Sequence, residues 1–317
     1  MSVLGIDLGG TKLACAIFSE DGGILLKETV AVGKRKGHEV GSLITDTIKR
    51  LVKRSESEGN NIRSIGISVP GISGSRTGKV WAPNIEGWTD YPLHSEVSRI
   101  SGEIPVAIDS DRACYILGEV WKGNARGCRD AVFLAVGTGI GAGIMINGEI
   151  LRGSNDIAGS TGWMGLNRPF REQYTSCGCF EYHASGGGIA KVAKHVLSEH
   201  PEYDSMLRRA DPDKITSHEI FAAYEKNDKV AVKVIKEAIE FWGMAVANFV
   251  SLFNPEKIIF GGGVFGPAVS LIPEIGKEAA KWAQPISFTQ VKLDVSALGG
   301  DAGVCGAGYL ALKKIIG

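Results

Sequence analysis

The sequence predicts an α/β protein made of two similar lobes. Two observations support this fold class. A strand, a glycine-rich turn and a returning strand occur twice, over residues 3–18 and 131–146, which suggests an internal duplication in which each lobe presents a glycine hairpin. The chain also has 317 residues, of which 44% are hydrophobic, and this is enough for two domains that each bury a core.

The first lobe begins with an antiparallel meander. Ser2 to Ile6 and Leu13 to Phe18 are expected strands, and Asp21-Gly22-Gly23 turns the chain into a third. A helix is expected over 39–57, then a strand that ends at Val69 before Pro70-Gly71. A short strand over 104–108 leads to a helix over 113–122, whose N-terminus carries Asp109-Ser110-Asp111.

The second lobe repeats the opening pattern. Strands are expected over 131–136 and 140–146, joined by the turn at 137–139, and Asn147-Gly148 signals a further hairpin. Apolar residues at helical spacing predict a core helix over 229–253. A buried strand over 258–260 ends at three glycines, and the chain closes with a helix over 301–315.

Composition excludes several classes of partner. Lysine plus arginine equals aspartate plus glutamate, 35 against 35, so there is no basic footprint for nucleic acid. No signal peptide and no apolar run of membrane-spanning length is recognisable. The six cysteines have no framework spacing, which favours reduced thiols and a cytoplasmic protein.

The turn at 7–12, Asp-Leu-Gly-Gly-Thr-Lys, has the chemistry of a phosphate site. Gly9 and Gly10 let backbone N–H groups approach phosphate oxygens, and the Thr11 hydroxyl adds a donor. Asp7 can hold Mg²⁺ through water, and Lys12 completes the motif. A plain β-turn explains the same residues about as well when this motif is taken alone.

Two further glycine turns follow buried strands. Gly137-Thr138-Gly139 offers bare backbone to phosphate, and it is neither a P-loop nor a dinucleotide fingerprint. Gly261-Gly262-Gly263 could form a flat surface for a base or ribose. A simple strand-to-helix turn is the competing interpretation, although such a turn needs one glycine at most.

In order and spacing, these motifs resemble the ROK family (repressors, open reading frames and kinases) of the actin-like ATPase superfamily. The likeness runs nearly end to end. It rests on the turn at 7–12, Val-Pro-Gly at 69–71, Ala-Pro-Asn at 82–84 with Trp88, the Asp111 region, Gly-Thr-Gly-Ile-Gly at 137–141, Gly-Cys-Phe-Glu at 178–181, the triplet at 261–263 and Leu-Gly-Gly-Asp-Ala-Gly at 298–303.

The resemblance implies a sugar kinase that uses ATP and Mg²⁺. It implies two actin-like (ribonuclease H-like) lobes around a central cleft, with residues 1–111 plus 300–317 in a small lobe and 112–299 in a large one. The expected partner is a small-molecule sugar, with no nucleic acid and no membrane, and the resemblance allows a homodimer.

The resemblance also assigns roles to single residues. Asp111 matches the general base that accepts the proton of the attacking sugar hydroxyl, and Asp109 is then a helix cap or a supporting residue, since capping is common at such positions. Asn84 and Glu181 match ligands of sugar hydroxyls, and Gly71 matches a backbone contact beside the sugar. Trp88 is a pocket wall or a core residue.

Three positions depart from the family pattern. Ser110 stands where asparagine is usual before the catalytic aspartate, and Ser160 and Trp163 replace a sugar-binding glutamate and a histidine that binds sugar and zinc. The resemblance implies that these three residues belong to the substrate-binding set. We therefore expect an acceptor other than plain glucose, such as an amino sugar, an N-acyl sugar or another modified hexose.

The zinc motif of the family is eroded. Glu172 and Tyr174 occupy two of the cysteine positions and Cys179 alone matches. Because a structural zinc needs four ligands, a chain without zinc is favoured, although Cys177 and His183 leave a rearranged site open.

Two other functions compete. A repressor of this family would need a DNA-binding domain, and the first strand already starts by residue 3. A catalytically weak sugar-binding or regulatory protein is the second alternative, motivated by Ser110, Ser160 and Trp163.

Overall fold

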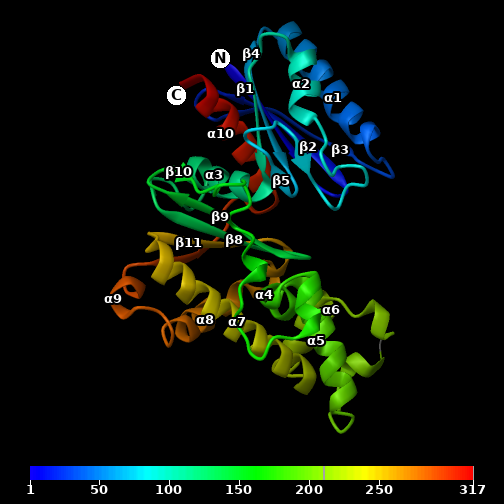
Figure 1. The fold of residues 1–317 in the computed structure, drawn as a ribbon, viewed down its shortest axis with the longest axis vertical. Coiled ribbons are helices and arrows are strands. Elements are labelled where there is room, and N and C mark those ends of the chain that lie inside the picture. The colour runs from blue at the N-terminus through cyan, green and yellow to red at the C-terminus, as the bar shows by residue number, and fades with distance from the viewer. Residues whose placement is uncertain (210, 317) are drawn as a thin grey trace. The chain divides into compact units, whose positions relative to one another are not determined.

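The computed structural model describes residues 1–209 and 211–316, which form two compact units. The first unit contains Met1–Gly127, Ile150–Ala158 and the residues from Ala297 onward. The second contains Cys128–Glu149 and Gly159–Ser296. Figure 1 traces the chain through both.

The first unit is built on a five-stranded sheet of order β3-β2-β1-β4-β7. Its strands are β1 (Ser2–Leu8), β2 (Lys12–Ser19), β3 (Ile24–Ala31), β4 (Ile62–Val69) and β7 (Val106–Ser110). The first three are antiparallel, whereas β4 and β7 run parallel to β1. A separate ribbon pairs β5 (Ile72–Ser73) with β6 (Val80–Trp81).

Side-chain alternation along β2 divides the core of this unit between two faces of the sheet. Leu13, Cys15 and Ile17 pack with residues of α1 (His38–Ser57) and α2 (Leu93–Ser101). Ala14, Ala16 and Phe18 pack with α10 (Ala302–Ile316) on the other face. The same unit contains α3 (Asp111–Lys122) and a 3₁₀ turn, η7 (Gly299–Asp301).

Glycines bring α10 unusually close to the sheet. A Cβ at Gly5 would lie 2.6 Å from the Val304 carbonyl oxygen, and one at Gly66 would overlap the backbone at Ala307. A Cβ at Gly118 of α3 would likewise overlap the backbone at Ala302. The first turn of α10 is therefore packed against the carboxyl-terminal half of β1. Figure 1 shows α10 in red beside the blue strands of this sheet.

The second unit repeats the strand order of the first, as β10-β9-β8-β11-β12. Its strands are β8 (Ala131–Val136), β9 (Ile140–Ile146), β10 (Glu149–Ile150), β11 (Lys257–Gly261) and β12 (Lys292–Val295). Here too β8 and β9 are antiparallel, and β11 and β12 run parallel to β8. The predicted duplication is thus visible as one topology used twice.

The second unit carries most of the helices. They are α4 (Cys179–Ala184), α5 (Gly186–Glu199), α6 (Ser217–Tyr224), α7 (Lys229–Phe253), α8 (Ile272–Ala279) and α9 (Pro285–Phe288), with 3₁₀ turns η1 (Thr161–Trp163), η2 (Glu172–Ser176), η3 (Met206–Arg209), η4 (Pro212–Lys214), η5 (Gly263–Phe265) and η6 (Pro267–Leu271). The long apolar face of α7 joins sheet and helices in one core.

The compact units differ from the expected lobes in two longer segments and in residues 297–299, which belong to the first unit. Residues 112–127 and 150–158, expected in the large lobe, belong to the first unit. The reason is packing: a Cβ at Gly306 of α10 would overlap the backbone at Cys114 of α3, so these helices lie in close contact. Among the described residues no helix is long and apolar enough to span a membrane.

Candidate functional site

The first glycine turn connects β1 to β2 and presents Asp7. The turn is closed by the Gly9 N–H, which donates to the Lys12 carbonyl oxygen at 2.9 Å. Asp7 is partly buried, and its Oδ1 accepts a 2.6 Å hydrogen bond from the Ser68 hydroxyl. Burial raises the pKa of Asp7 above its ordinary value, against the opposing effects of Ser68 and the Lys12 charge. Gly10, Thr11 and Lys12 are exposed.

Asp111 begins α3 directly after β7. Its Oδ1 accepts from the Arg112 N–H at 2.8 Å, and the Tyr115 hydroxyl lies 3.5 Å from its Oδ2. Burial raises the pKa of Asp111 to about 6, with the Arg112 charge opposing and the nearby Asp7 carboxylate adding to the rise. A carboxylate with such a pKa can accept a proton near neutral pH.

Ser110, not Asp109, caps α3. The Ser110 hydroxyl accepts from the Ala113 N–H at 3.3 Å, so of the two roles expected for Asp109, cap or supporting residue, the cap is excluded. Asp109 is buried, forms an ion pair with Arg152 and accepts a 2.8 Å bond from the Ser110 N–H. Burial raises the pKa of Asp109 above its ordinary value, although the Arg152 charge opposes this rise. Asp109 thus supports the strand end from which Asp111 projects.

Gly71 and Asn84 lie on loops of the same unit. Gly71 has φ +91°, and a Cβ there would overlap the Trp81 carbonyl oxygen, so the position requires glycine. Its carbonyl oxygen accepts a 3.2 Å bond from the Arg112 guanidinium. Asn84 is exposed in a turn.

Trp88 is a core residue of this loop region, which settles the choice between core and pocket wall. It is 1% exposed, and its ring stacks on Tyr91 with centroids 4.3 Å apart. Its Nε1 donates to the Gly37 carbonyl oxygen at 3.0 Å.

The second glycine turn, between β8 and β9, is held from outside by Glu181 of α4. Glu181 Oε2 accepts from the Ile140 N–H at 2.6 Å, and a Cβ at Gly139 would lie 2.6 Å from the same oxygen. The Gly186 N–H donates to the Gly137 carbonyl oxygen at 2.8 Å. Burial raises the pKa of Glu181, opposed by the Ile140 N–H and Lys191. Thr138, at the tip, is exposed.

The segment that departs from the family pattern lies beside Glu181. A Cβ at Gly162 would lie 2.9 Å from Glu181 Cβ, so η1 packs on α4. Ser160 is partly buried at the start of η1, and Trp163 at its end is 59% exposed. Within residues 1–209 and 211–316, the Thr161 Oγ1 is a buried side-chain oxygen without a hydrogen-bond partner.

The glycine triplet is explained largely by packing. A Cβ at Gly261 would overlap the Phe133 ring. Gly262 has φ +89°, and a Cβ there would overlap the backbone of Val136. A Cβ at Gly263 would meet no described atom within 4 Å, so packing does not require glycine at this third position.

Both ring nitrogens of His183 have hydrogen-bonding partners within the protein. Nε2 lies 2.8 Å from the Tyr174 hydroxyl and Nδ1 lies 2.6 Å from Glu237 Oε1. Cys179 is buried, and Cys177 is partly buried. The described part of the chain holds no group of three or more His, Cys, Asp or Glu side chains that could bind a metal ion.

The comparisons with known proteins identify the family. The model of the ROK family matches residues 3–314. The chain belongs to the ROK family. It is 34% identical to a glucokinase of Halalkalibacterium halodurans, over 98% of this chain and 95% of that protein. It is 33% identical to a xylose repressor of Caldicellulosiruptor bescii, over 99% of this chain and 79% of the repressor.

A solved ROK structure shares the fold. A ROK family glucokinase from Streptomyces griseus, in complex with glucose and AMPPNP, superposes with a TM-score of 0.76 and 29% identity, covering 99% of this chain and 100% of that one. The predicted family and actin-like α/β fold class are therefore confirmed.

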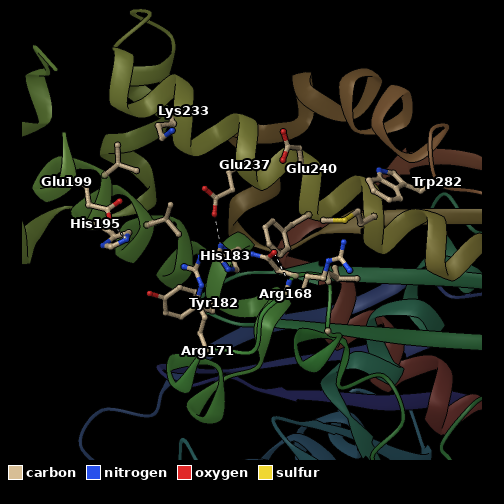
Figure 2. A pocket seen from close by; sticks show the side chains of 17 residues that line it. Arg168, Arg171, Tyr182, His183, His195, Glu199, Lys233, Glu237, Glu240 and Trp282 are labelled. Carbon is tan, nitrogen blue, oxygen red and sulfur yellow. Dashed lines mark hydrogen bonds and ion pairs between the residues drawn. The ribbon is translucent and has the colours of Figure 1, made fainter. Parts of the chain in front are cut away.

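A cavity of about 790 Å³ lies in the second unit. None of the predicted ATP or sugar residues lines it, although Tyr182 and His183, which follow Glu181 in the chain, do. It lies between α5, α7 and the segment 165–171, and Figure 2 shows Glu237 pointing from α7 toward His183 at its floor. The ring of His183 stacks on Phe241 at 4.3 Å, which makes this floor part of the core.

Sequence reasoning missed four residues that support the site: Ser68, Arg112, Tyr115 and Arg152. Tyr115 lies four residues after Asp111 on α3, so helical spacing could have pointed to it, whereas Arg112 follows Asp111 directly. Ser68 lies in an apolar run, and Arg152 is distant in sequence from Asp109. No local pattern identifies these two.

Proposed function

We propose that this ROK protein is a cytoplasmic ATP-dependent kinase that phosphorylates a hydroxyl group of a sugar, with Asp111 as the general base. The observation that carries the proposal is the position of Asp111 at the start of α3, with its pKa raised to about 6 by burial. Such a carboxylate is ionised at neutral pH and can orient the attacking hydroxyl and accept its proton. The glucokinase relatives support the same reaction.

The phosphates of ATP would contact the two glycine turns. Gly10, Thr11 and Lys12 offer exposed donors in the first unit, in a turn that the Gly9 N–H closes, and Gly137, Thr138 and Gly139 offer backbone in the second. Gly263 supplies open backbone for the nucleoside, while Gly261 and Gly262 shape the turn before it.

Asp7 fits a magnesium site. Its carboxylate is a hard oxygen ligand of the kind Mg²⁺ prefers, and it lies beside the phosphate turn. Bound through water at Asp7, Mg²⁺ would neutralise charge that develops on the phosphates.

The acceptor would contact Asn84, Gly71 and Glu181 as well as Asp111. Glu181 would serve both the sugar and the second turn, since one of its oxygens accepts from Ile140. Ser110 caps α3, so its influence on the sugar would be indirect. Ser160 in place of a carboxylate, and the exposed indole of Trp163 in place of a histidine, support an acceptor other than plain glucose.

A coupled assay of ADP release over a panel of hexoses, amino sugars and N-acyl sugars tests the proposal. We expect turnover with at least one sugar, and a higher kcat/KM for a modified hexose than for glucose. Glucose as the best substrate would overturn the acceptor assignment, and no turnover with any sugar would overturn the kinase. Light scattering on the purified chain tests the homodimer.

A sugar-binding regulatory protein with weak catalysis is the second candidate. The similarity to a xylose repressor and the three departures at Ser110, Ser160 and Trp163 favour it. It predicts that sugar and ATP both bind, as calorimetry would measure, while the coupled assay stays at background for every sugar that binds.

A further inference from the structure

The Asp7 carboxylate is held by its neighbour on the adjacent strand. Ser68 of β4 is the register partner of Asp7 in the parallel β1–β4 pair, and the Ser68 hydroxyl donates to Asp7 Oδ1 at 2.6 Å. Ser68 is fully buried. A donor that is itself fixed in the sheet limits the rotation of the carboxylate it binds.

The other side of the carboxylate lies against α10. A Cβ at Gly303, the second residue of α10, would overlap the Asp7 carboxylate, with Oδ2 as its nearest atom. The bare Cα of Gly303 therefore leaves the space that the carboxylate occupies. The first turn of a helix also favours a negative charge beside it.

We propose that Ser68 and Gly303 are positioning residues for Asp7, and that they hold its carboxylate in the one orientation that accepts the water ligands of a Mg²⁺–nucleotide. In this arrangement Ser68 engages Oδ1, and the bare Cα of Gly303 leaves room for Oδ2. The inference rests on the proposed function, because it concerns how this chain binds Mg²⁺·ATP.

A purely structural role for Ser68 makes a different prediction. If its hydroxyl only satisfied a buried polar group, its loss would lower stability without distinguishing the metal-bound nucleotide from the free one. The same strand offers a matched control. Ser64 of β4 is also fully buried, and its hydroxyl donates to the Pro105 carbonyl oxygen at 3.2 Å, away from Asp7.

The experiment compares Ser68→Ala with Ser64→Ala. The Kd of AMPPNP is measured by calorimetry with Mg²⁺ and again with EDTA, and thermal melting is followed for each variant. For Ser68→Ala we expect a Kd for Mg²⁺·AMPPNP about ten-fold higher, since a hydrogen bond to a charged group is lost, and an unchanged Kd in EDTA. For Ser64→Ala we expect a lower melting temperature and both Kd values as in the wild type.

A second pair perturbs the opposite side of Asp7. Gly303→Ala should weaken binding of Mg²⁺·AMPPNP in the same selective way. Its control is Gly308→Ala on the same helix, where the added Cβ would lie 2.5 Å from the Phe18 ring instead. This pair decides the question if Ser68→Ala does not fold.

The outcomes separate the inference from the proposed function. Equal loss of affinity with and without Mg²⁺, or no loss in either Asp7-facing variant, overturns the positioning role while the wild type still phosphorylates sugar. A wild-type protein that binds no Mg²⁺·AMPPNP overturns the proposed function, and the positioning role with it.

Discussion

The two units share one strand order, yet their glycine turns are supported in different ways. The turn after β1 has chemistry of its own: Asp7 precedes it, Lys12 ends it, and Ser68 and Gly303 fix Asp7 from within the same unit. The turn after β8 has no charged residue between Val136 and Gly141, and a side chain of α4, Glu181, reaches it from outside. The same strand order therefore carries one turn flanked by charged side chains and one turn made only of uncharged residues.

This difference suggests a division of labour. Asp111 and Asp7 both lie in the first unit, and the Asp7 carboxylate adds to the rise in the pKa of Asp111. The second unit contributes backbone donors and the segment around Ser160 and Trp163. Substitution of Asp111 should therefore affect the chemical step, whereas substitutions in the second unit should affect binding.

The largest effect is expected for Asp111→Asn. Loss of the general base should lower kcat by about 10²–10⁴-fold, with the KM values for ATP and sugar close to those of the wild type. Steady-state kinetics on the best sugar of the panel measures both. Asp46→Asn is a suitable control, because Asp46 is an exposed carboxylate on α1 of the same unit, where it pairs with Lys49. A kcat within a few-fold of the wild type would place the base elsewhere.

The pH dependence should report the same residue. Asp111 must be ionised to accept a proton, so kcat/KM should fall about ten-fold per pH unit below a pKa of about 6. Stability runs in the opposite direction, because a folded-state pKa raised above 3.8 favours the native protein when Asp111 is protonated. That contribution is lost as pH rises through about 6.

Asp111→Asn should therefore stabilise the protein at pH 8, by about 1–3 kcal/mol for a shift of this size. Urea unfolding at pH 8 and pH 5 measures the effect, which should shrink at the lower pH. A variant less stable than the wild type at pH 8 would contradict a raised pKa.

Substitutions of Glu181 test the second turn. Glu181→Ala removes the acceptor of the Ile140 N–H and should raise the KM for ATP about ten-fold, in proportion to a lost hydrogen bond to a charged group. Glu181→Gln keeps an acceptor oxygen, so its KM for ATP should be close to that of the wild type. Its KM for sugar should be raised, as in Glu181→Ala, because the carboxylate that contacts the sugar is lost in both variants. If both variants keep a wild-type KM for ATP, the carboxylate does not support this turn.

The sequence predicted an element in full where local signals define its ends, and in part where pairing with a distant strand defines them. The helix over 229–253 was predicted with its observed bounds, since its apolar face is continuous and the Asp228 side chain caps it by accepting from two backbone N–H groups. The strand before α3 was placed at 104–108 but covers Val106–Ser110. Polar Asp109 and Ser110 extend it because they pair with Ser68 and Val69 of β4, which no local pattern reveals.

The candidate site was predicted by residue type and order, but its supports were not. Asp7, Asp111 and the glycines stand in recognisable motifs. Their partners are separated from them by 61 residues for Ser68 and 43 for Arg152, so only the folded chain brings them together. Ser110 shows the reverse case: its position suggested substrate binding, and its hydroxyl caps a helix.

The smallest effect is expected at Thr161, in the segment where the second unit departs from the family pattern. Its hydroxyl is buried, and among the described residues it has no hydrogen-bond partner. Thr161→Val removes the polar group and keeps the shape, so the desolvation penalty disappears and the free energy of unfolding should rise by up to about 1 kcal/mol. Urea unfolding measures it, with Thr45→Val as the control, because the Thr45 hydroxyl donates to the Ser42 carbonyl oxygen at 3.1 Å. A loss of stability in Thr161→Val would mean that a bound water satisfies the hydroxyl, and a raised sugar KM alongside it would assign this water to the acceptor side of the second unit.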